Sequence, residues 1–291
     1  MSPGIFLVKY DISLTDELFR EKILRDMACL VSGPLILQTE GVVHLQNQMF
    51  EAVARFLGRE PERLFRILSR PEPRLPLGKW FERIFLAALR ITFPFAEIRH
   101  SVSDESGGEL DFLIIENHLT THIECAVKFF LRDPASGTGL RSYVGPSGQD
   151  RLDLKFQKMR DVQLRRIVPP RFVQSGRIKK VLWMSGRVHE PLVPGTHGLS
   201  GPIVSPMSPR VVTGYWGPIG DVLMTVAPEE ELYMLPRQWW ITDLTGLSRL
   251  DLSVFELLSP GLPLTEPIMT ARVRFDGDRA VELARGFIIS R

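Results

Sequence analysis

Apolar positions recur at helical spacing through the first third of the chain, which predicts helices there. The positions that follow this period are Phe19, Ile23, Met27 and Leu30, and then Phe50, Val53 and Leu57. Thr15 is a suitable N-cap for the first helix, Gly58 marks the end of the second, and Pro61 opens a third. After a proline-rich break, the segment KWFERIFLAALRI is apolar on most sides, so we expect a fourth helix near residues 79–91.

The pattern then changes to short apolar runs separated by turn residues, which predicts strands. Three runs, Phe95–Val102, Glu109–Glu116 and Thr121–Leu131, are separated by SDESGG and ENH, and a meander or hairpin pair is the simplest arrangement. A polar loop leads into a helix from about Asp150, and RIKKVLWMSG follows as a fourth strand. The predicted order in this region is α, β, β, β, α, β.

The last third of the chain has a weaker pattern. From Pro191 to Pro218 the chain is dense in Pro, Gly and Ser, which predicts a long loop or a boundary. ARVRF and DRAVELARGFII flank Asp276 and Gly277, which suits a closing hairpin with a tight turn. We therefore expect a mixed α/β (α+β) protein with a helical region at 1–77, a core at 78–190 and a loop-rich extension with strands at 191–291.

Composition narrows the class of protein. The 291 residues are 44% hydrophobic, enough for one large domain or a core with appendages. No apolar run approaches the ~18 residues of a membrane span, and the start of the chain lacks a secretory pattern, so we expect a cytoplasmic protein. Cys29 and Cys125 lie in apolar stretches and fit buried free thiols. The net charge of +2 does not by itself indicate nucleic-acid binding.

Acidic residues inside the apolar strands are the clearest chemical signal. Asp111 stands in a strand that is apolar on both faces, and an unpaired buried carboxylate costs several kcal/mol or takes up a proton. On the next strand Glu124 shares a face with His122 and Lys128. Taken alone, that alternation favours an ordinary half-buried strand with one wet face, because any antiparallel strand over a core shows it.

Two further polar residues extend this group. In the helix after the polar loop, the inward stripe of Leu152, Phe156 and Met159 continues to Gln163. Glu82, from the helix before the strands, lies beside the solvent-facing stripe of that helix, near Leu86 and Leu89. Glu82, Asp111, Glu124 and Gln163 therefore predict one polar site built from four elements, with a buried structural network as the alternative. Carboxylates from adjacent strands suit Mg²⁺ or Mn²⁺, and a nearby lysine would suit phosphodiester hydrolysis.

The element order, Glu82, GELD ending at Asp111, and the acidic strand with Glu124 and Lys128 resemble the PD-(D/E)XK nuclease superfamily, over about residues 78–187. ILRDMACLVSGPLIL, LGKWFERI, GELDFL, HIECAVKFFL, YVGPSGQDRLDLKFQKM and QWW are similar to the bacterial family DUF1853, a domain of unknown function. The superfamily resemblance implies a restriction-endonuclease-like αβββαβ core with a mixed sheet. It also implies Asp111 and Glu124 as metal ligands, Glu82 as an assisting acid and a catalytic strand lysine.

The lysine departs from the superfamily pattern. The usual lysine follows the acidic residue by two positions, where this chain has Ala126, and Lys128 lies two residues further along the same face. At ~3.3 Å per residue this sets Lys128 ~13 Å from Glu124 along the strand. We rank Lys128 first as the cationic group, with Lys155 on the following helix as the alternative. A degenerate nuclease fold that binds nucleic acid or a protein is the second hypothesis.

A basic segment follows the site residues. Between Arg151 and Arg187 the only acidic residues are Asp153 and Asp161. The basic residues are Arg151, Lys155, Lys158, Arg160, Arg165, Arg166, Arg171, Arg177, Lys179, Lys180 and Arg187. The segment predicts a phosphate-binding surface for nucleic acid, with an ordinary solvated helix face as the alternative. A third hypothesis is a structural network in a chain whose helical arm and C-terminal third bind a protein partner.

Overall fold

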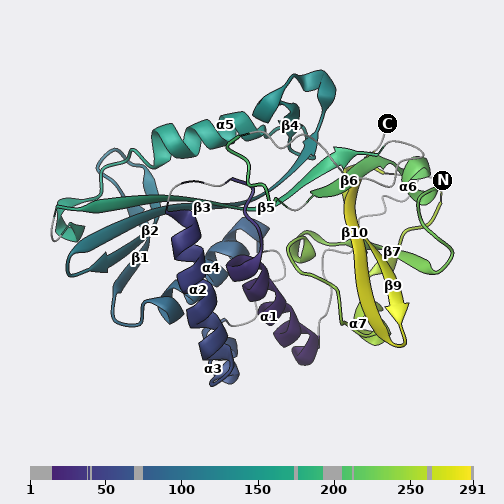
Figure 1. The fold of residues 1–291 in the computed structure, drawn as a ribbon, viewed down its shortest axis with the longest axis horizontal. Coiled ribbons are helices and arrows are strands. Elements are labelled where there is room, and N and C mark those ends of the chain that lie inside the picture. Colours follow the sequence, from purple (N-terminus) through teal and green to yellow (C-terminus); the bar gives the residue numbers. More distant parts are fainter. Residues whose placement is uncertain are drawn as a thin grey trace, which may run out of the picture.

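The computed structural model describes residues 15–37, 39, 41–68, 75–173, 176–192, 205–211, 213–260 and 264–289. Over these residues the fold is mixed α/β, with one ten-stranded mixed sheet and seven α-helices (Figure 1). The helices are α1 (Asp16–Ser32), α2 (Val42–Leu57), α3 (Pro61–Ile67), α4 (Leu77–Thr92), α5 (Leu152–Gln157), α6 (Ile219–Leu223) and α7 (Arg249–Leu252). None of the helices in the described part is long and apolar enough to cross a membrane.

The strands form one continuous sheet in the order β1-β2-β3-β5-β6-β10-β9-β7-β8, with β4 paired to β3. The three strands β3, β5 and β6 run parallel, as does β10 beside β6, whereas the outer pairs at both ends are antiparallel. The strands are β1 (Glu97–Ser103), β2 (Glu109–Glu116), β3 (Leu119–Arg132), β4 (Tyr143–Val144), β5 (Ile178–Pro191), β6 (Thr213–Pro218), β7 (Glu230–Leu235), β8 (Glu256–Leu257), β9 (Ile268–Asp276) and β10 (Arg279–Ile289).

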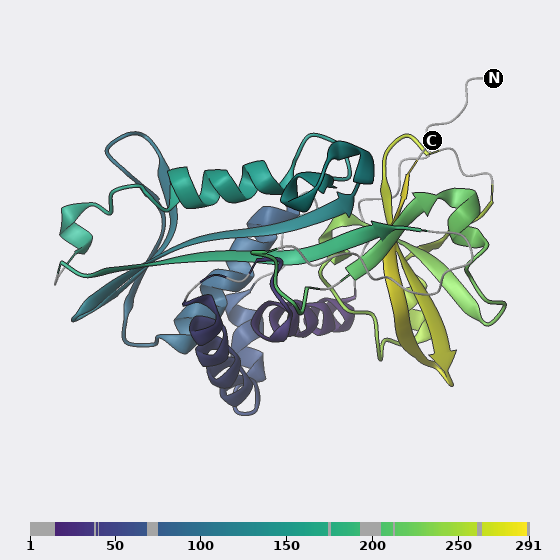
Figure 2. The ribbon, with the colours of Figure 1, turned by 45° about the horizontal axis from the view of Figure 1, so that its top comes forward.

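The helices lie on opposite faces of the first part of the sheet. Figures 1 and 2 show α1, α2 and α4 on one face and α5 on the other. Side chains of β3 alternate accordingly: Ile123 and Cys125 pack in the core under α1 and α4, whereas Ala126 and Phe130 pack with Leu152 of α5. This two-sided burial explains why β2 and β3 are rich in apolar residues on both faces.

The predicted helices and strands are confirmed, with shifted ends. The Thr15 side chain accepts a hydrogen bond from the Leu18 N–H at 3.1 Å and caps α1. The closing hairpin is present as β9 and β10, and Gly277 has the positive φ of +58° that a tight turn requires. The order α4, β1, β2, β3, α5, β5 matches the predicted α, β, β, β, α, β, apart from the short β4.

The prediction of a long loop from Pro191 to Pro218 is partly wrong. The last residues of this segment, Thr213–Pro218, form β6 between β5 and β10, so the sheet continues without interruption into the C-terminal third. The glycine and proline residues between Gly214 and Pro218 are typical of a loop, so the sequence pattern does not reveal this strand. A Cβ at Gly214 would lie 2.3 Å from the carbonyl oxygen of Arg285, which shows how closely the backbones of β6 and β10 pack there. Residues 193–204 of the expected loop lie outside the described part of the chain.

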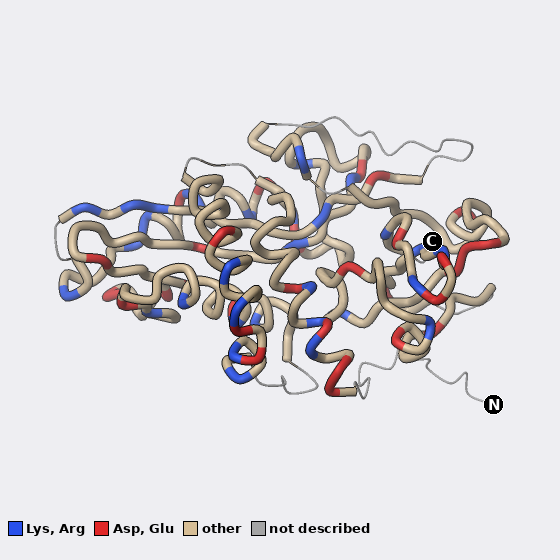
Figure 3. Tube along the Cα trace, turned by 60° about the horizontal axis from the view of Figure 1, so that its bottom comes forward, with Lys and Arg blue, Asp and Glu red and all other residues tan. Residues whose placement is uncertain are grey.

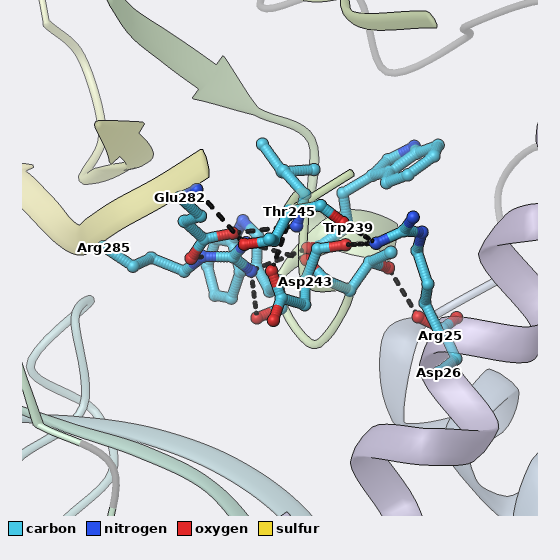
Figure 4. Close-up of polar contacts among 10 residues, drawn as sticks. Arg25, Asp26, Trp239, Asp243, Thr245, Glu282 and Arg285 are labelled. Carbon is cyan, nitrogen blue, oxygen red and sulfur yellow. Dashed lines mark hydrogen bonds and ion pairs between the residues drawn. The ribbon is translucent and has the colours of Figure 1, made fainter. Parts of the chain in front are cut away.

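A buried polar junction joins helix α1 to the C-terminal strands (Figure 4). Arg285 of β10 is 1% exposed, and its guanidinium donates to the carbonyl oxygens of Trp239, Trp240 and Thr242 and to the Glu282 carboxylate. From α1, Arg25 donates to the Thr245 carbonyl, so the segment between η5 (Arg237–Trp239) and β10 is held from both sides. The C-terminal third is therefore anchored by hydrogen bonds as well as by the sheet.

Candidate functional site

Asp111 lies where strands β2 and β3 separate. Their pairing ends at Phe112 opposite Ile123, and one more step in this register sets Asp111 opposite Glu124. At that step a side chain replaces the backbone acceptor, because the Cys125 N–H donates to Asp111 Oδ2 at 2.8 Å. The carboxylate is thus fixed at the point where the sheet opens, and the apolar neighbours of Asp111 on β2 are buried.

Glu124 is fully buried and is held from two elements. His122 Nε2 lies 2.8 Å from Glu124 Oε1, and Gln163 Nε2 donates to Glu124 Oε2 at 2.7 Å. Gln163 belongs to a π-helical turn, η3 (Lys158–Gln163), that continues α5 and is closed by the Leu164 N–H donating to the Met159 carbonyl. Such turns are uncommon and often occur at functional sites. The predicted contact of Gln163 with the acidic strand is therefore present.

The two carboxylates repel each other. The pKa of Asp111 is raised from 3.8 to about 7, first by burial and then by the negative charge of Glu124, with a further contribution from Glu82. The Cys125 N–H and the charge of Lys155 act in the opposite direction. Within the described residues, neither Asp111 nor Glu124 has a Lys or Arg within ion-pairing distance. The pair therefore carries negative charge that a cation would neutralise.

Lys155 of α5 is a lysine whose charge acts on Asp111, and Lys79 of α4 also lies within electrostatic reach of Asp111. Its side chain is partly buried, and its pKa is lowered mainly by that burial and then by the positive charge of Lys128. Asp111 acts in the opposite direction on the pKa of Lys155, which places the two groups within electrostatic reach of each other. In the described part of the chain, the ammonium of Lys155 has no ion-pair partner.

The other two predicted site residues each have an ion-pair partner outside the pair. Lys128, ranked first from the sequence, lies with Nζ 2.5 Å from Asp150 Oδ2. Glu82 contributes charge at Asp111, but its carboxylate forms an ion pair with Lys79 of the same helix at 2.7 Å. Asp111, Glu124 and Gln163 therefore form the centre of the site, with Glu82 and Lys128 at its edge.

The donor set decides which metal this site fits. No cluster of three or more His, Cys, Asp or Glu side chains suited to a metal occurs in the described residues. Two neighbouring carboxylates without a cationic partner fit Mg²⁺ or Mn²⁺, which are usually held by one or two carboxylates with water and phosphate supplying the remaining oxygens. The residues that would hold the ion are Asp111 and Glu124. Glu82 fits only as an assisting group, because Lys79 already pairs with it.

Two residues at the site have weaker signals in the sequence. His122 shares a face with Glu124, but no pattern indicates that its ring contacts the carboxylate. Lys155 lies beside the inward stripe of its helix, and the sequence alone favours Lys128 over it. The signal that favours Lys155 is its distance along the chain from Leu152, since residues three apart on a helix lie on neighbouring positions of one face.

The basic segment is only partly neutralised. Arg151, Arg160, Arg165 and Arg166 form ion pairs with aspartates. The cations of this segment that have no ion-pair partner within the described ranges are Lys155, Lys158, Arg171, Arg177, Lys179, Lys180 and Arg187. Figure 3 shows Lys and Arg along the start of β5 at one end of the molecule and Asp and Glu near the C-terminal strands at the other. By strand alternation, Lys180 lies on the same sheet face as Glu124, beside His122.

The raised pKa of Asp111 predicts a pH-dependent stability in the absence of metal. The contribution of the protonated carboxyl is fully present below the unfolded pKa near 3.8, and it is lost as the pH rises through about 7. Asp111→Asn removes this loss, so the variant is expected to become more stable than the wild type by about 1 to 3 kcal/mol at pH 8. Urea unfolding of both proteins between pH 4 and pH 8, with a chelator present, measures the difference.

The control for this measurement is a carboxyl shifted in the other direction. The pKa of Asp153 is lowered, first by its hydrogen bond with Arg151, so its stabilising effect is present at neutral pH and is lost on acidification. Asp153→Asn is therefore expected to reduce stability most at neutral pH. A difference between Asp111→Asn and wild type that stays constant from pH 4 to pH 8 would contradict the electrostatic repulsion described above.

Comparison with known proteins gives one match. A family model described as a domain of unknown function, DUF1853, matches residues 25–289. No curated protein and no solved structure matches the chain.

Proposed function

The chain belongs to the DUF1853 family of domains of unknown function, and from the geometry of its site we propose that it is a divalent-metal-dependent nuclease that hydrolyses phosphodiester bonds. The observation that carries this proposal is the pair formed by Asp111 and Glu124. Two crowded carboxylates, without an ion-pairing lysine or arginine in the described residues, lie where β2 and β3 separate. A partly buried ammonium, Lys155, acts on the same place.

The order of elements supports the same proposal. Helix α4 is followed by the antiparallel strands β1, β2 and β3, and α5 then leads into β5, which runs parallel to β3. This arrangement is what the resemblance to the PD-(D/E)XK superfamily implies, and a restriction-endonuclease-like core is part of the proposal. In that interpretation Asp111 and Glu124 occupy the positions of the two acidic residues.

In this proposal each residue of the site has a separate role. Asp111 and Glu124 would hold the ion, and Gln163 contacts the Glu124 carboxylate from the turn that continues α5. When bound, a divalent cation neutralises charge on phosphoryl oxygens and makes a water molecule more acidic. Lys155 supplies positive charge beside Asp111, where it stabilises negative charge that develops on the phosphate in the transition state. Lys158 and Lys180 bind neighbouring phosphates of the nucleic acid.

Lys155 is proposed as the catalytic cation in preference to Lys128. Lys128 is neutralised by Asp150, whereas Lys155 has no ion-pair partner in the described residues and its pKa is sensitive to Asp111. Lys155→Met is expected to reduce the turnover number about 10²- to 10³-fold. Lys128→Met, which removes a lysine from the same sheet face, is the matched control and is expected to stay close to wild type. A larger loss in Lys128→Met than in Lys155→Met would reverse the assignment.

The direct test uses the purified full chain with fluorescently labelled single- and double-stranded DNA and RNA. We expect cleavage of at least one substrate with Mg²⁺ or Mn²⁺. We expect no cleavage with a chelator or in a buffer without added divalent cation. Each reaction is paired with a binding measurement under the same conditions. Cleavage that does not depend on a divalent cation would contradict the proposal, because the two carboxylates alone supply no Lewis acid to neutralise the charge on the phosphate.

The alternative is a nuclease fold that binds nucleic acid without cutting it. Ala126 at the usual lysine position and the pairing of Lys128 with Asp150 favour it. In this case binding occurs without cleavage, and the affinity falls steeply with salt as counterions are released. Absence of both binding and cleavage would instead favour a structural polar network.

A further inference from the structure

We propose that His122 is a positioning residue, which together with Gln163 fixes the orientation of the Glu124 carboxylate for a divalent cation. This inference rests on the proposed metal site and adds to it a residue with no assigned role. His122 would act through Glu124 and not by contact with the ion or the substrate.

The position of His122 is rigid. The residue is fully buried on β3, the third strand of the sheet, and is paired with Leu113 on β2 and with Lys180 on β5. Its Nε2 lies 2.8 Å from Glu124 Oε1. A carboxylate that holds a cation only accepts hydrogen bonds, so in the proposed site His122 donates to Glu124 from Nε2. The donor therefore comes from a part of the fold that has little freedom to move.

Gln163 holds the other oxygen from a different layer. Its Nε2 donates to Glu124 Oε2 at 2.7 Å, and it lies in the π-helical turn above the sheet. The two donors occupy opposite oxygens, so rotation of the carboxylate would break at least one hydrogen bond. Each carboxylate oxygen can accept about two hydrogen bonds. One acceptor position on each oxygen therefore remains available for a cation shared with Asp111.

Stability alone does not account for this pair. His122 Nδ1 and Gln163 Oε1 are both buried and have no hydrogen-bond partner within the described residues. A buried unsatisfied polar atom costs about 1 to 3 kcal/mol, and replacing both partners of a buried bond by apolar groups is often nearly neutral. Two polar side chains with one unpaired atom each are therefore a poor solution for packing. They are a suitable solution for orienting a buried carboxylate, as in metal sites where outer residues orient the ligands.

The chain offers a matched control in His189. This histidine is also fully buried on a central strand, and its Nε2 likewise has no partner in the described ranges. Its Nδ1 lies 3.2 Å from the Phe130 carbonyl oxygen, and the ring packs edge-on against Phe287. No carboxylate among the residues that the structure describes is bonded to it. Loss of His189 therefore tests the general effect of removing a buried histidine.

The experiment measures Mn²⁺ binding to the full chain by titration calorimetry and by the electron paramagnetic resonance of free Mn²⁺, without substrate. His122→Leu is expected to weaken Mn²⁺ binding about 10- to 100-fold. His122→Gln, which keeps a donor at a similar reach, is expected to restore most of the affinity. His189→Leu is expected to lower the melting temperature and leave the Mn²⁺ affinity unchanged, so a purely structural effect is separated from positioning.

The outcomes distinguish this inference from the proposed function. If the wild type shows no saturable Mn²⁺ binding, or if Asp111→Asn binds as tightly as wild type, the metal site fails and the role of His122 fails with it. If the wild type binds, Asp111→Asn does not, and His122→Leu binds like wild type, only the positioning role is overturned. If His122→Leu does not fold, Gln163→Leu in the less buried helical turn decides, with the same expected weakening.

Discussion

Replacing Asp111 by asparagine is expected to lower metal-dependent cleavage of nucleic acid by about 10³-fold or more, without loss of the fold. The amide keeps the size of the side chain and can still accept the Cys125 N–H through its carbonyl oxygen. It carries no negative charge, so half of the charge that the carboxylate pair offers to a divalent cation is lost. The repulsion that raises the pKa of Asp111 to about 7 is removed at the same time.

This variant separates catalysis from stability because the two are expected to change in opposite directions. At pH 8 without metal, Asp111→Asn should be the more stable protein, while its turnover number with Mg²⁺ or Mn²⁺ falls. Initial rates on labelled oligonucleotides at saturating metal measure the turnover. Asp150→Asn is the matched control, since Asp150 is an exposed aspartate whose ion pair among the described residues is with Lys128, at the edge of the site. Cleavage that survives in Asp111→Asn would show that the carboxylate pair is not the active site.

The largest effect on stability is expected at Asp26, in the junction between α1 and the C-terminal segment. Asp26 is fully buried, forms an ion pair with the buried Lys22, and accepts hydrogen bonds from Trp80 Nε1 at 2.7 Å and from Thr242 Oγ1. Asp26→Leu leaves the Lys22 ammonium without its counterion. We expect a loss of about 3 to 5 kcal/mol in the free energy of unfolding, measured by urea denaturation.

A double variant tests whether the loss comes from the unpaired charge. The Lys22 ammonium lies between the rings of Trp80 and Trp239, about 5.2 and 5.4 Å from their centroids, in surroundings that suit an apolar side chain. Lys22→Met with Asp26→Leu removes both charges, and an apolar pair in place of a buried ion pair is often neutral or stabilising. We therefore expect the double variant to recover a large part of the lost stability. A double variant that is less stable than Asp26→Leu would show that the hydrogen bonds of Asp26, and not the charge of Lys22, dominate.

Several features of the site could be predicted because they depend on local order. Asp111 was identified because a strand with apolar residues on both faces is buried on both faces, so a carboxylate within it is exceptional wherever the strand lies. Gln163 was identified because the stripe of Leu152, Phe156 and Met159 fixes which side of the helix faces the sheet. Both arguments need only the period of one element.

Other features depend on distances between elements, and the hydrophobic period of a single element gives no information about those distances. Lys128 and Lys155 both lie on the face of the sheet that α5 covers, and the sequence ranked Lys128 first because it stands on the acidic strand. The structure pairs Lys128 with Asp150, from the loop before α5, and brings the charge of Lys155 to Asp111. The contact that distinguishes the two lysines joins Lys128 to Asp150, which are 22 residues apart in the chain. No local pattern encodes such a contact.

The strand β6 and the histidine contact at Glu124 show the same limit. Thr213–Pro218 contains glycine and proline, which disfavour a strand locally, yet it is held between β5 and β10 by backbone hydrogen bonds on both sides. His122 follows the alternation of β3, but the contact of its ring with Glu124 is visible only in the folded structure.

The sequence by itself determined the order of elements, the place of Asp111 in a strand that is apolar on both faces, and the family to which the chain belongs. These follow from hydrophobic periods, from turn residues and from long ordered blocks, all of which are written along the chain. Only the tertiary structure decided which lysine acts on Asp111, what holds Glu124, and how the C-terminal strands continue the sheet. Those outcomes follow from electrostatic and hydrogen-bond contacts between elements, whose strength depends on distances and burial that exist only once the chain has folded.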